Sequence, residues 1–481
     1  MPASSDYAPD PRFSGLGPDF ADVVAPARFP QTILRFRNQS AAETVGLASL
    51  TDSEWLAHFA RFEPLPGNQA APLAMRYHGH QFRAYNPDLG DGRGFLFAQL
   101  REGRTGRLLD LGTKGSGQTP WSRAGDGRLT LKGGVREVLA TAMLEALGAP
   151  TSRSFSLIET GEALERGDEP SPTRGAVLTR LSHSHIRFGS FQRLAALART
   201  DLMAILVAHC LECYAPHFAS AGDPGAALLA CAVTGSARLT ARWMTAGFVH
   251  GVLNTDNMNI NGESFDYGPY RFLPRNDPNF TAAYFDNTGL YSFGRQPEAV
   301  FWNLRQLAGA LNLITPEAPL VEALNGFSAA YRAELAAAML MRLGLRSQGA
   351  DADSALANDA FRALAEGGET LRWEPFFFDW FGGDASEERA MRGPRAALYG
   401  GDAFKTFRAR LSAHKTADLE ALGNPWFHTP EPEELLYDQI EAIWARIADA
   451  DDWSAFNAKL AAIETARAAW NFTRAPDEPS V

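Results

Sequence analysis

Hydrophobic residues in the first half of the chain fall into short continuous runs separated by glycine-rich turns, a pattern typical of strands. Between these runs, apolar residues spaced three and four positions apart predict helices. The predicted elements are a helix over 52–62 with an N-cap at Thr51 or Ser53, two strands joined by a turn at 102–106, an amphipathic helix over 134–147, and strands over 154–161 and 176–181. Together they predict a mostly antiparallel N-terminal lobe.

The second half of the chain has a mainly helical pattern. Helical periodicity extends over 190–248, the segment 284–311 ends in an apolar helix, and residues 347–481 are helical and rich in Trp and Phe. The stretch 250–268, HGVLNTDNMNINGESFDYG, predicts a loop, a short strand, a turn and a return strand that carries Asp266.

These patterns predict an α+β fold with four regions. The regions are an N-terminal wrapping extension (1–72), an N-lobe (73–181), a C-lobe that contains the 250–268 loop (182–346), and a helical C-terminal region (347–481).

Composition narrows the possible functions. With 481 residues, 45% of them hydrophobic, the chain is long enough to bury a large core. A formal net charge of −11 argues against a nucleic-acid binder, because such proteins usually present a basic face, so any phosphate site must be a local basic pocket. The N-terminus lacks the apolar core of a signal peptide, and polar residues interrupt the most apolar run, 202–214. We therefore expect a cytoplasmic protein without nucleic-acid or membrane partners.

Two motifs that often bind metals are interpreted as structural. Cys210 and Cys213 form a C-x-x-C that could indicate zinc or redox chemistry, but no second pair exists and the flanking residues predict a buried helix. His78 and His80 also lack an acidic or cysteine ligand at suitable spacing, so hydrogen bonding is the expected role.

The candidate chemistry lies in 250–268. Asp256 and Asn257 end a loop, and Asp266 opens an Asp-Tyr-Gly triplet, the arrangement by which kinase-like folds hold a divalent ion on nucleotide phosphates. Small-molecule kinases whose loop starts with His-Gly place an aspartate base where this chain has Val252. Because valine accepts no proton, Asp256 becomes the candidate base. The alternative is a polar turn without chemistry.

A phosphate site is predicted from basic residues near glycines. Arg93 lies in Gly-Asp-Gly-Arg-Gly, and Lys114 ends a strand beside further glycines, although no P-loop is present. Glu137 on the following helix is a candidate ion-pair partner of Lys114, the alternative being a solvated charge near a helix N-terminus. Arg180 and Arg187 either bind a triphosphate together with Lys114 and Arg93 or are surface charges.

With these residues in place, the chain resembles the selenoprotein O family, protein adenylyltransferases with a pseudokinase fold, over about residues 73–310. The resemblance is carried by GHQF (79–82), NPDLGDGRG (86–94), KGSGQTPWSR (114–123), TRLSHSHIRFG (179–189), HGVLNTDNM (250–258), DYGPY (266–270) and FDN (285–287). It implies a two-lobed, protein-kinase-like fold that binds ATP flipped relative to kinases, with the γ-phosphate deep and the α-phosphate exposed. AMP would then pass to a protein hydroxyl.

The resemblance also implies residue roles. The residues implied for the nucleotide are Lys114, Arg180 and Arg187 on the phosphates, and Gly90, Gly92, Arg93, Asp126, Gly127 and Asp266 in the rest of the site. Asp256 would be the general base, and Asn257 and Asp266 would hold Mg²⁺ or Mn²⁺. The expected reaction transfers AMP from ATP to Ser, Thr or Tyr of a protein. The alternatives are a kinase that releases ADP and a non-catalytic nucleotide-binding scaffold.

Two departures from the family pattern affect regulation and substrate choice. Many members carry a selenocysteine or cysteine close to the C-terminus, whereas this chain has no cysteine after Cys231. The C-terminal region also follows the family pattern only weakly.

Overall fold

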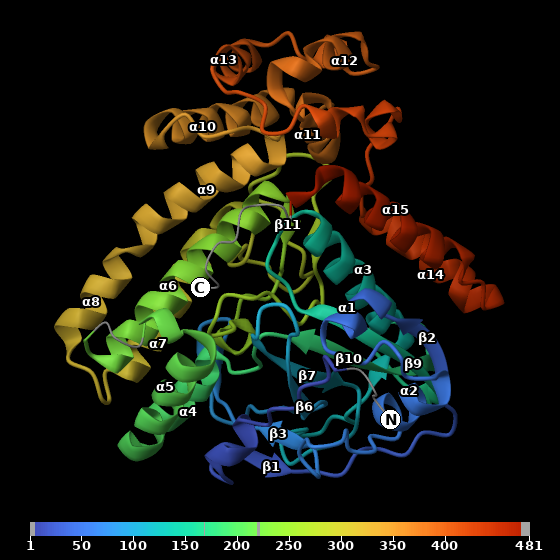
Figure 1. The fold of residues 1–481 in the computed structure, drawn as a ribbon, viewed down its shortest axis with the longest axis vertical. Coiled ribbons are helices and arrows are strands. Elements are labelled where there is room, and N and C mark those ends of the chain that lie inside the picture. The colour runs from blue at the N-terminus through green and yellow to red at the C-terminus, as the bar shows by residue number, and fades with distance from the viewer. Residues whose placement is uncertain (1–4, 168, 219–221, 473–481) are drawn as a thin grey trace.

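An 8-stranded antiparallel sheet forms the lower part of the molecule as drawn in Figure 1. The structure, a computed structural model, describes residues 5–167, 169–218 and 222–472. The strands follow the order β1-β3-β6-β7-β10-β9-β2, and β8 pairs with β10. Their bounds are β1 (Ala21–Val23), β2 (Ile33–Arg37), β3 (Leu73–Met75), β6 (Leu96–Arg101), β7 (Leu108–Lys114), β8 (Leu129–Thr130), β9 (Arg153–Leu164) and β10 (Thr173–Ser182). The α+β class is therefore confirmed.

The predicted elements of the first half are present with shifted ends. The helix expected over 52–62 is α2 (Asp52–Phe59), which begins at a reciprocal capping box between Thr51 and Glu54. The helix expected over 134–147 is α3 (Leu131–Ala146), which starts earlier because the Thr130 side chain accepts a hydrogen bond from the Gly133 amide. All four predicted strands are confirmed as β6, β7, β9 and β10.

The N-terminal 72 residues supply both outer strands of the sheet. β1 pairs with β3, and β2 pairs with β9. The ring of Trp55 on α2 stacks on Phe155 of β9 with 4.9 Å between ring centroids. Aromatic packing of this kind anchors the segment to the sheet.

Helices make up the rest of the molecule (Figure 1). Their bounds are α1 (Gln39–Thr44), α4 (Phe188–Ala196), α5 (Thr200–Tyr214), α6 (Pro224–Thr245), α7 (Gln296–Leu311), α8 (Glu317–Asn325), α9 (Phe327–Leu343), α10 (Ala350–Gly367), α11 (Trp373–Trp380), α12 (Glu387–Arg392), α13 (Asp402–Leu411), α14 (Tyr437–Ala450) and α15 (Ser454–Trp470). The helical predictions for 190–248, for the end of 284–311 and for the C-terminal region are confirmed in the described residues. Residues 473–481 of that last region lie outside them.

The last two helices return to the sheet. In Figure 1, α14 and α15 run along the side of the molecule that carries α3. Lys132 on α3 forms an ion pair with Glu441 on α14 at 2.7 Å. Asp451, between α14 and α15, accepts hydrogen bonds from Arg174 of β10 at 2.6 Å and from Arg35 of β2 at 3.0 Å. Helix α3 is therefore enclosed between the sheet and helices α14 and α15.

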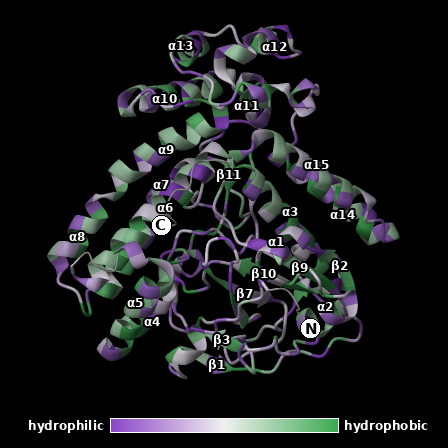
Figure 2. Ribbon diagram, viewed as in Figure 1, coloured by the Kyte–Doolittle hydropathy of each residue, from purple (hydrophilic) through white to green (hydrophobic). Residues whose placement is uncertain are grey.

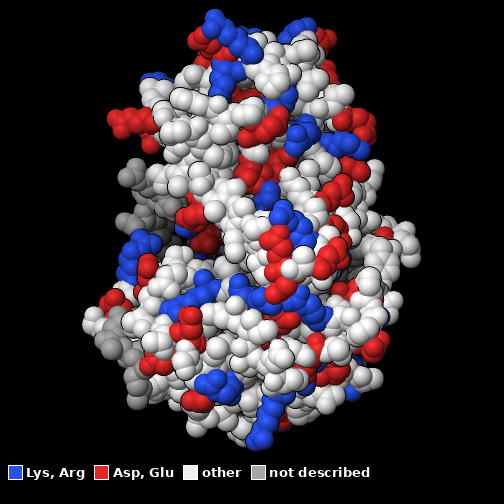
Figure 3. Space-filling view, turned by 90° about the vertical axis from the view of Figure 1, so that its right-hand side faces the viewer, with Lys and Arg blue, Asp and Glu red and all other residues white. Residues whose placement is uncertain are grey.

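Hydrophobic and hydrophilic residues are distributed differently in the sheet and in the outlying helices. Figure 2 shows hydrophobic residues in β9 and β10 and mixed hydrophobic and hydrophilic residues along outlying helices such as α14. On the face in Figure 3, basic side chains lie among acidic ones.

The buried helix predicted around the Cys motif and the hydrogen bonds predicted for the two histidines are present. Cys210, Cys213 and Cys231 are buried free thiols, the first two on α5. The His78 Nδ1 is hydrogen-bonded to the Tyr85 hydroxyl at 2.6 Å, and His80 Nδ1 accepts from Gln192 at 2.8 Å.

Among the described residues, no helix has the length and apolar character that crossing a bilayer requires.

Candidate functional site

The loop with the candidate chemistry is bracketed by a short strand pair. β11 (Phe248–Val249) and β12 (Arg271–Phe272) pair antiparallel and bring the two ends of the loop together. Between them, Thr255–Asn257 form one turn of 3-10 helix. The return strand predicted for Asp266 is wrong, because Asp266 lies outside any strand and has a φ of 64°. This left-handed conformation is incompatible with a strand, and aspartate is among the residues that tolerate it.

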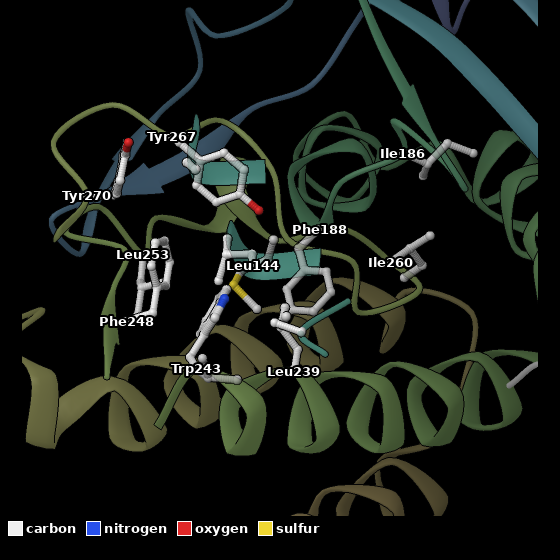
Figure 4. Close-up of a cluster of buried hydrophobic side chains, with 14 of the residues drawn as sticks. Leu144, Ile186, Phe188, Leu239, Trp243, Phe248, Leu253, Ile260, Tyr267 and Tyr270 are labelled. Carbon is white, nitrogen blue, oxygen red and sulfur yellow. The ribbon is translucent and has the colours of Figure 1, made fainter. Parts of the chain in front are cut away.

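Aromatic packing fixes the Asp-Tyr-Gly segment (Figure 4). Tyr267 and Tyr270 point into a buried cluster that also contains Phe248 and Trp243. The Tyr267 hydroxyl is hydrogen-bonded to Thr151 Oγ1 at 2.5 Å. Because Tyr267 directly follows Asp266 and Tyr270 lies shortly after it, their burial restricts the backbone that carries the Asp266 carboxylate.

The Thr255–Asn257 turn is held by hydrogen bonds from three directions. Thr255 Oγ1 donates to Gln192 at 2.6 Å and accepts from the His80 amide at 2.7 Å. The Asn257 Nδ2 donates to the Val252 carbonyl at 3.0 Å. This last bond leaves the Asn257 amide oxygen as the free acceptor of its side chain.

Four charges meet at Asp266, three of them buried and Asp266 itself partly exposed. Lys114 Nζ lies 2.5 Å from Glu137 Oε1 and 2.5 Å from Asp266 Oδ1. Arg180 Nη2 reaches the same two oxygens at 3.0 and 2.9 Å. The predicted Lys114–Glu137 pair is thus present, and a solvated Glu137 is excluded because its side chain is 1% exposed. Two cations and two carboxylates balance, which reduces the penalty of burying each charge.

Burial and pairing act in opposite directions on the pKa values of this cluster. Burial alone would raise the pKa of Asp266, but Lys114 and Arg180 outweigh it and hold that pKa well below its usual value. The pKa of Glu137 is lowered for the same reason. Burial lowers the pKa of Lys114, while Asp266 and Glu137 oppose the change. Both carboxylates are therefore ionised at neutral pH.

Arg187 lines the same cavity as this cluster and is bonded to Asp256 and Asp91. Its Nη1 donates to the backbone oxygen of Asp256 at 3.0 Å, and its Nη2 donates to Asp91 at 3.1 Å. The guanidinium also stacks on Tyr77 at 4.4 Å and on Phe265 at 4.9 Å. Arg187 and Arg180 are both buried, which excludes the alternative that they are surface charges.

Asp256 is a buried carboxylate with an unused oxygen. Its Oδ1 has no hydrogen-bond partner within the described residues. Burial raises the pKa of Asp256 to about 6, against the opposing effect of Arg187. A buried acid with a perturbed pKa beside a cavity is a candidate for proton transfer.

One cavity of about 680 Å³ collects these groups. Of the residues predicted from the sequence, it is lined by Gly90, Gly92, Arg93, Lys114, Asp126, Gly127, Arg180, Arg187, Asp256 and Asp266. Asn257 is the predicted residue that does not line it, although it adjoins Asp256 in the same turn.

Sequence reasoning missed several other residues of the cavity wall. These are Tyr77, Gln81, Asp91, Trp121, Arg123 and Arg166. Asp91 had a signal, since it lies between two predicted glycines. No sequence pattern indicated Arg166, because it lies in the connection between β9 and β10. At the cavity it forms an ion pair with Asp126 at 2.8 Å.

The glycines of the cavity allow two segments to touch. A Cβ at Gly90 would lie 2.3 Å from the Trp121 ring, and one at Gly127 would lie 2.3 Å from the Gly117 backbone. Gly127 also has a φ of 70°. The glycine-rich segments therefore form one packed wall.

The loop of residues 250–268 contains oxygen donors of the kind that suits a hard divalent ion. Within the described residues, no group of three or more His, Cys, Asp or Glu side chains could hold a metal alone. The Asn257 amide oxygen and the Asp266 carboxylate are oxygen ligands of the kind that Mg²⁺ and Mn²⁺ prefer. Magnesium sites commonly use one or two carboxylates and complete their coordination with nucleotide phosphates.

A cavity that combines buried cations with a carboxylate of raised pKa is typical of an enzyme that acts on a phosphorylated substrate. The family model described as Protein adenylyltransferase SelO matches residues 4–464. The chain therefore belongs to the SelO family of protein adenylyltransferases and is an enzyme of the nucleotidyltransferase class. The resemblance seen in the sequence motifs is confirmed.

Individual relatives agree with this assignment, and each carries the name Protein nucleotidyltransferase YdiU. The chain is 45% identical to the protein of Gloeobacter violaceus over 459 residues, covering 94% of this chain and 93% of the relative. Identity to the Synechococcus elongatus protein is 42% over 496 residues, with 96% of each chain covered. Identity to the Pseudomonas putida strain GB-1 protein is 40% over 372 residues, covering 76% and 75%.

Proposed function

We propose that this protein transfers AMP from ATP to Ser, Thr or Tyr hydroxyls of proteins and releases pyrophosphate. The observation that carries the proposal is the shared cavity, in which Lys114, Arg180 and Arg187 lie beside the buried carboxylate of Asp256. Cationic side chains are the usual donors to phosphate oxygens, and the carboxylate matches the need for a proton acceptor.

The fold that we propose for this reaction is the two-lobed kinase-like fold, with residues 73–181 as the N-lobe and 182–346 as the C-lobe. Residues 1–72 would wrap the N-lobe, and 347–481 would form the helical C-terminal region. The Lys114–Glu137 pair between β7 and α3 supports this proposal, because kinases fix their phosphate-binding lysine by such a pair.

In the proposed nucleotide site, Lys114, Arg180 and Arg187 hold phosphate oxygens. Arg93 is exposed at the cavity and supplies a further cation. Gly90, Gly92, Asp126 and Gly127 shape the wall against which the nucleotide lies. Buried cations bind phosphate more strongly than exposed ones because water competes less.

Asn257 and Asp266 would hold Mg²⁺ or Mn²⁺ together with the phosphates. The ion, when bound, polarises the phosphate oxygens and offsets the negative charge that develops in the transition state. Within the protein, the ion pairs with Lys114 and Arg180 keep the Asp266 carboxylate ionised.

Asp256 would take the proton from the incoming hydroxyl. A pKa of about 6 leaves most of the carboxylate ionised at neutral pH. The oxygen of the substrate then attacks the α-phosphorus, a P–O bond to AMP forms, and the bond to pyrophosphate breaks. The proton passes to Asp256 and later to solvent.

The rivals of this proposal differ in their products. A kinase on the same site would transfer the γ-phosphate and release ADP, and a scaffold would bind ATP without turnover. Incubation of full-length protein with ATP labelled at the α- or the γ-position separates the three. Transfer of the α-label to protein with release of pyrophosphate is expected, whereas transfer of the γ-label contradicts the proposal.

For location and partners, we propose a cytoplasmic protein that acts on ATP and on proteins, without nucleic-acid or membrane partners. The net charge of −11 and the mixed charges in Figure 3 support the exclusion of nucleic acid.

A further inference from the structure

The Phe-Asp-Asn motif at 285–287 has no place in the cavity described above, yet it lies on a loop with two exposed aromatic rings. Tyr284 is 82% exposed, more than any other large hydrophobic residue in the described part of the chain, and Phe285 is 46% exposed. Large apolar rings are usually buried, and adjacent exposed ones commonly mark a binding surface.

The loop that carries these exposed rings is held in place by hydrogen bonds and by buried residues. Asp286 is buried and accepts hydrogen bonds from the amides of Leu290 at 2.9 Å and Tyr291 at 2.8 Å. On the other side, Ala282 and Ala283 are buried. The loop is therefore anchored at both ends, and it presents the rings in a fixed position with little entropy left to lose on binding.

This loop rests on the elements that hold Asp256. Phe285 packs against Phe82, with 5.7 Å between ring centroids, at the tip of the hairpin β4–β5 (Gly79–Gln81 and Ala84–Asn86). The Phe82 amide donates to Asn254 Oδ1 at 3.0 Å, and the Tyr291 hydroxyl donates to the same atom at 2.8 Å. Asn254 is the residue before the Thr255–Asn257 turn.

The arginines near the rings are paired within the protein. Arg83 at the hairpin tip and Arg295 both pair with Glu298 at 3.2 Å. Arg83 also lies over the Trp302 ring at 5.5 Å. The two exposed rings themselves carry no charge, which favours an apolar side chain of a binding partner over an acidic or basic one.

We propose that Tyr284 and Phe285 bind the polypeptide substrate by accepting an apolar or aromatic side chain near the hydroxyl that receives AMP. This inference rests on the proposed function and adds a substrate class to it. Because Phe285 reaches the turn of Asp256 through Phe82 and Asn254, a side chain in the same extended segment as the acceptor hydroxyl would meet the rings. Neither ring lines the nucleotide cavity, so ATP binding does not require them.

Peptide kinetics with the full-length protein tests this inference. The substrates are dodecapeptides with one central Ser and a single Phe placed at each flanking position in turn, together with α-labelled ATP and Mg²⁺. Wild type should prefer Phe at particular flanking positions over peptides without Phe, and the scan locates those positions. In the Tyr284→Ala/Phe285→Ala variant, the KM for the preferred peptide should rise about tenfold, as for other aromatic contact residues, and the preference should disappear. The KM for ATP should not change.

Two further variants make the result specific. Tyr284→Phe keeps the ring and should behave as wild type, which also excludes the Tyr284 hydroxyl as the acceptor of AMP. Leu419→Ala removes a side chain that is 67% exposed in the C-terminal region and should leave the KM for the peptide unchanged.

A binding measurement separates this inference from the proposed reaction. The same peptides with Ala in place of Ser are titrated by fluorescence anisotropy, so that no turnover is needed. Equal binding of peptides with and without Phe, or binding unaffected in the double variant, overturns the inference. Phe-dependent binding in a protein that transfers no α-label supports the peptide surface and contradicts the adenylyl transfer instead.

Discussion

A buried carboxylate with a pKa of about 6 is suited to accept a proton in neutral solution, and Asp256 has this property because of burial. The Oδ1 atom of Asp256 is also buried, and it has no hydrogen-bond partner among the described residues. A residue placed only for stability would normally be hydrogen-bonded.

We expect Asp256→Ala to lower the transfer rate by about 10²–10⁴ while ATP affinity stays nearly constant, because a general base acts in the transition state. Single-turnover rates and ATP titration in the same preparation provide the measurement. An equal loss of affinity and rate would show that Asp256 positions the metal and does not act as the base.

The raised pKa of Asp256 also predicts a stability effect with a defined sign. Its pKa in the folded protein is about 6, above the ordinary value of 3.8, so the folded state binds more protons between these values and the free energy of unfolding falls as pH rises. Asp256→Asn should therefore be more stable than wild type by about 1–3 kcal/mol at pH 7–8. Urea unfolding at pH 7.5 and pH 4 measures the difference, which should largely vanish at the lower pH. Activity of the wild type should decline below about pH 6.

Lys114 is expected to contribute mainly to nucleotide binding. Lys114→Ala should weaken ATP binding by about 2–4 kcal/mol and nearly abolish transfer, because a desolvated, charge-assisted phosphate contact is lost. Lys132→Ala is the matched control, since Lys132 is a lysine on α3 that does not line the cavity. Calorimetric titration with ATP measures both, and an unchanged affinity in Lys114→Ala would remove this residue from the phosphate site.

At the scale of elements, helix α6 and the loop of residues 250–268 are in direct backbone contact. A Cβ at Gly235 on α6 would lie 2.8 Å from the Asn261 carbonyl, and one at Gly262 would lie 2.4 Å from the Gly235 backbone. The loop between the Thr255–Asn257 turn and Asp266 is therefore seated on α6 through two glycines.

Gly235→Ala should push the loop away from α6. We expect a loss of stability of about 1–3 kcal/mol and weaker ATP binding, since backbone atoms cannot yield as a side chain does. Gly309→Ala on α7 is the control, because nothing lies within 4 Å of its added Cβ. It should be neutral or more stable by about 0.4–1 kcal/mol. Thermal unfolding of both variants, with and without ATP, tests the comparison, and equal behaviour of the two would contradict the packing argument.

The elements that the sequence predicted are those with strong local patterns. Strands β6, β7, β9 and β10 are short segments rich in apolar residues, so their existence could be predicted without knowing their partners. By contrast, β1 and β2 are short strands in a proline-containing segment, and they exist because β3 and β9 lie beside them. The return strand at Asp266 failed because the ion pairs of its carboxylate and the packing of Tyr267 are tertiary effects.

The same distinction applies to the site. The Lys114–Glu137 pair could be predicted because both residues lie on regular elements at a spacing known from kinases. That Arg180 contacts the same two oxygens as Lys114, and that Arg166 joins the cavity through Asp126, depends on how distant segments approach each other. No local pattern contains that information.

For the whole molecule, the proposed metal site takes some ligands from the protein and others from the nucleotide. The stabilisation by ATP should therefore depend on the metal ion. ATP with Mg²⁺ should raise the unfolding temperature, because a ligand that binds only the folded state stabilises it by mass action. With excess EDTA, the shift produced by ATP should become smaller and turnover should stop. Differential scanning fluorimetry at fixed ATP is the measurement, and full turnover in EDTA would show that no divalent ion takes part.

The contact of Asp451 with Arg35 joins residues that are 416 positions apart in the chain. During synthesis from the N-terminus, the cover over α3 therefore cannot form until the chain has been made past Asp451. Until that time, β2 and α3 are a sheet edge and a helix with uncovered surfaces, the features by which unfinished chains associate with one another. Helices α14 and α15 thus cover α3 and contact β2 only late in synthesis, and termination before these helices would leave that edge and that helix exposed.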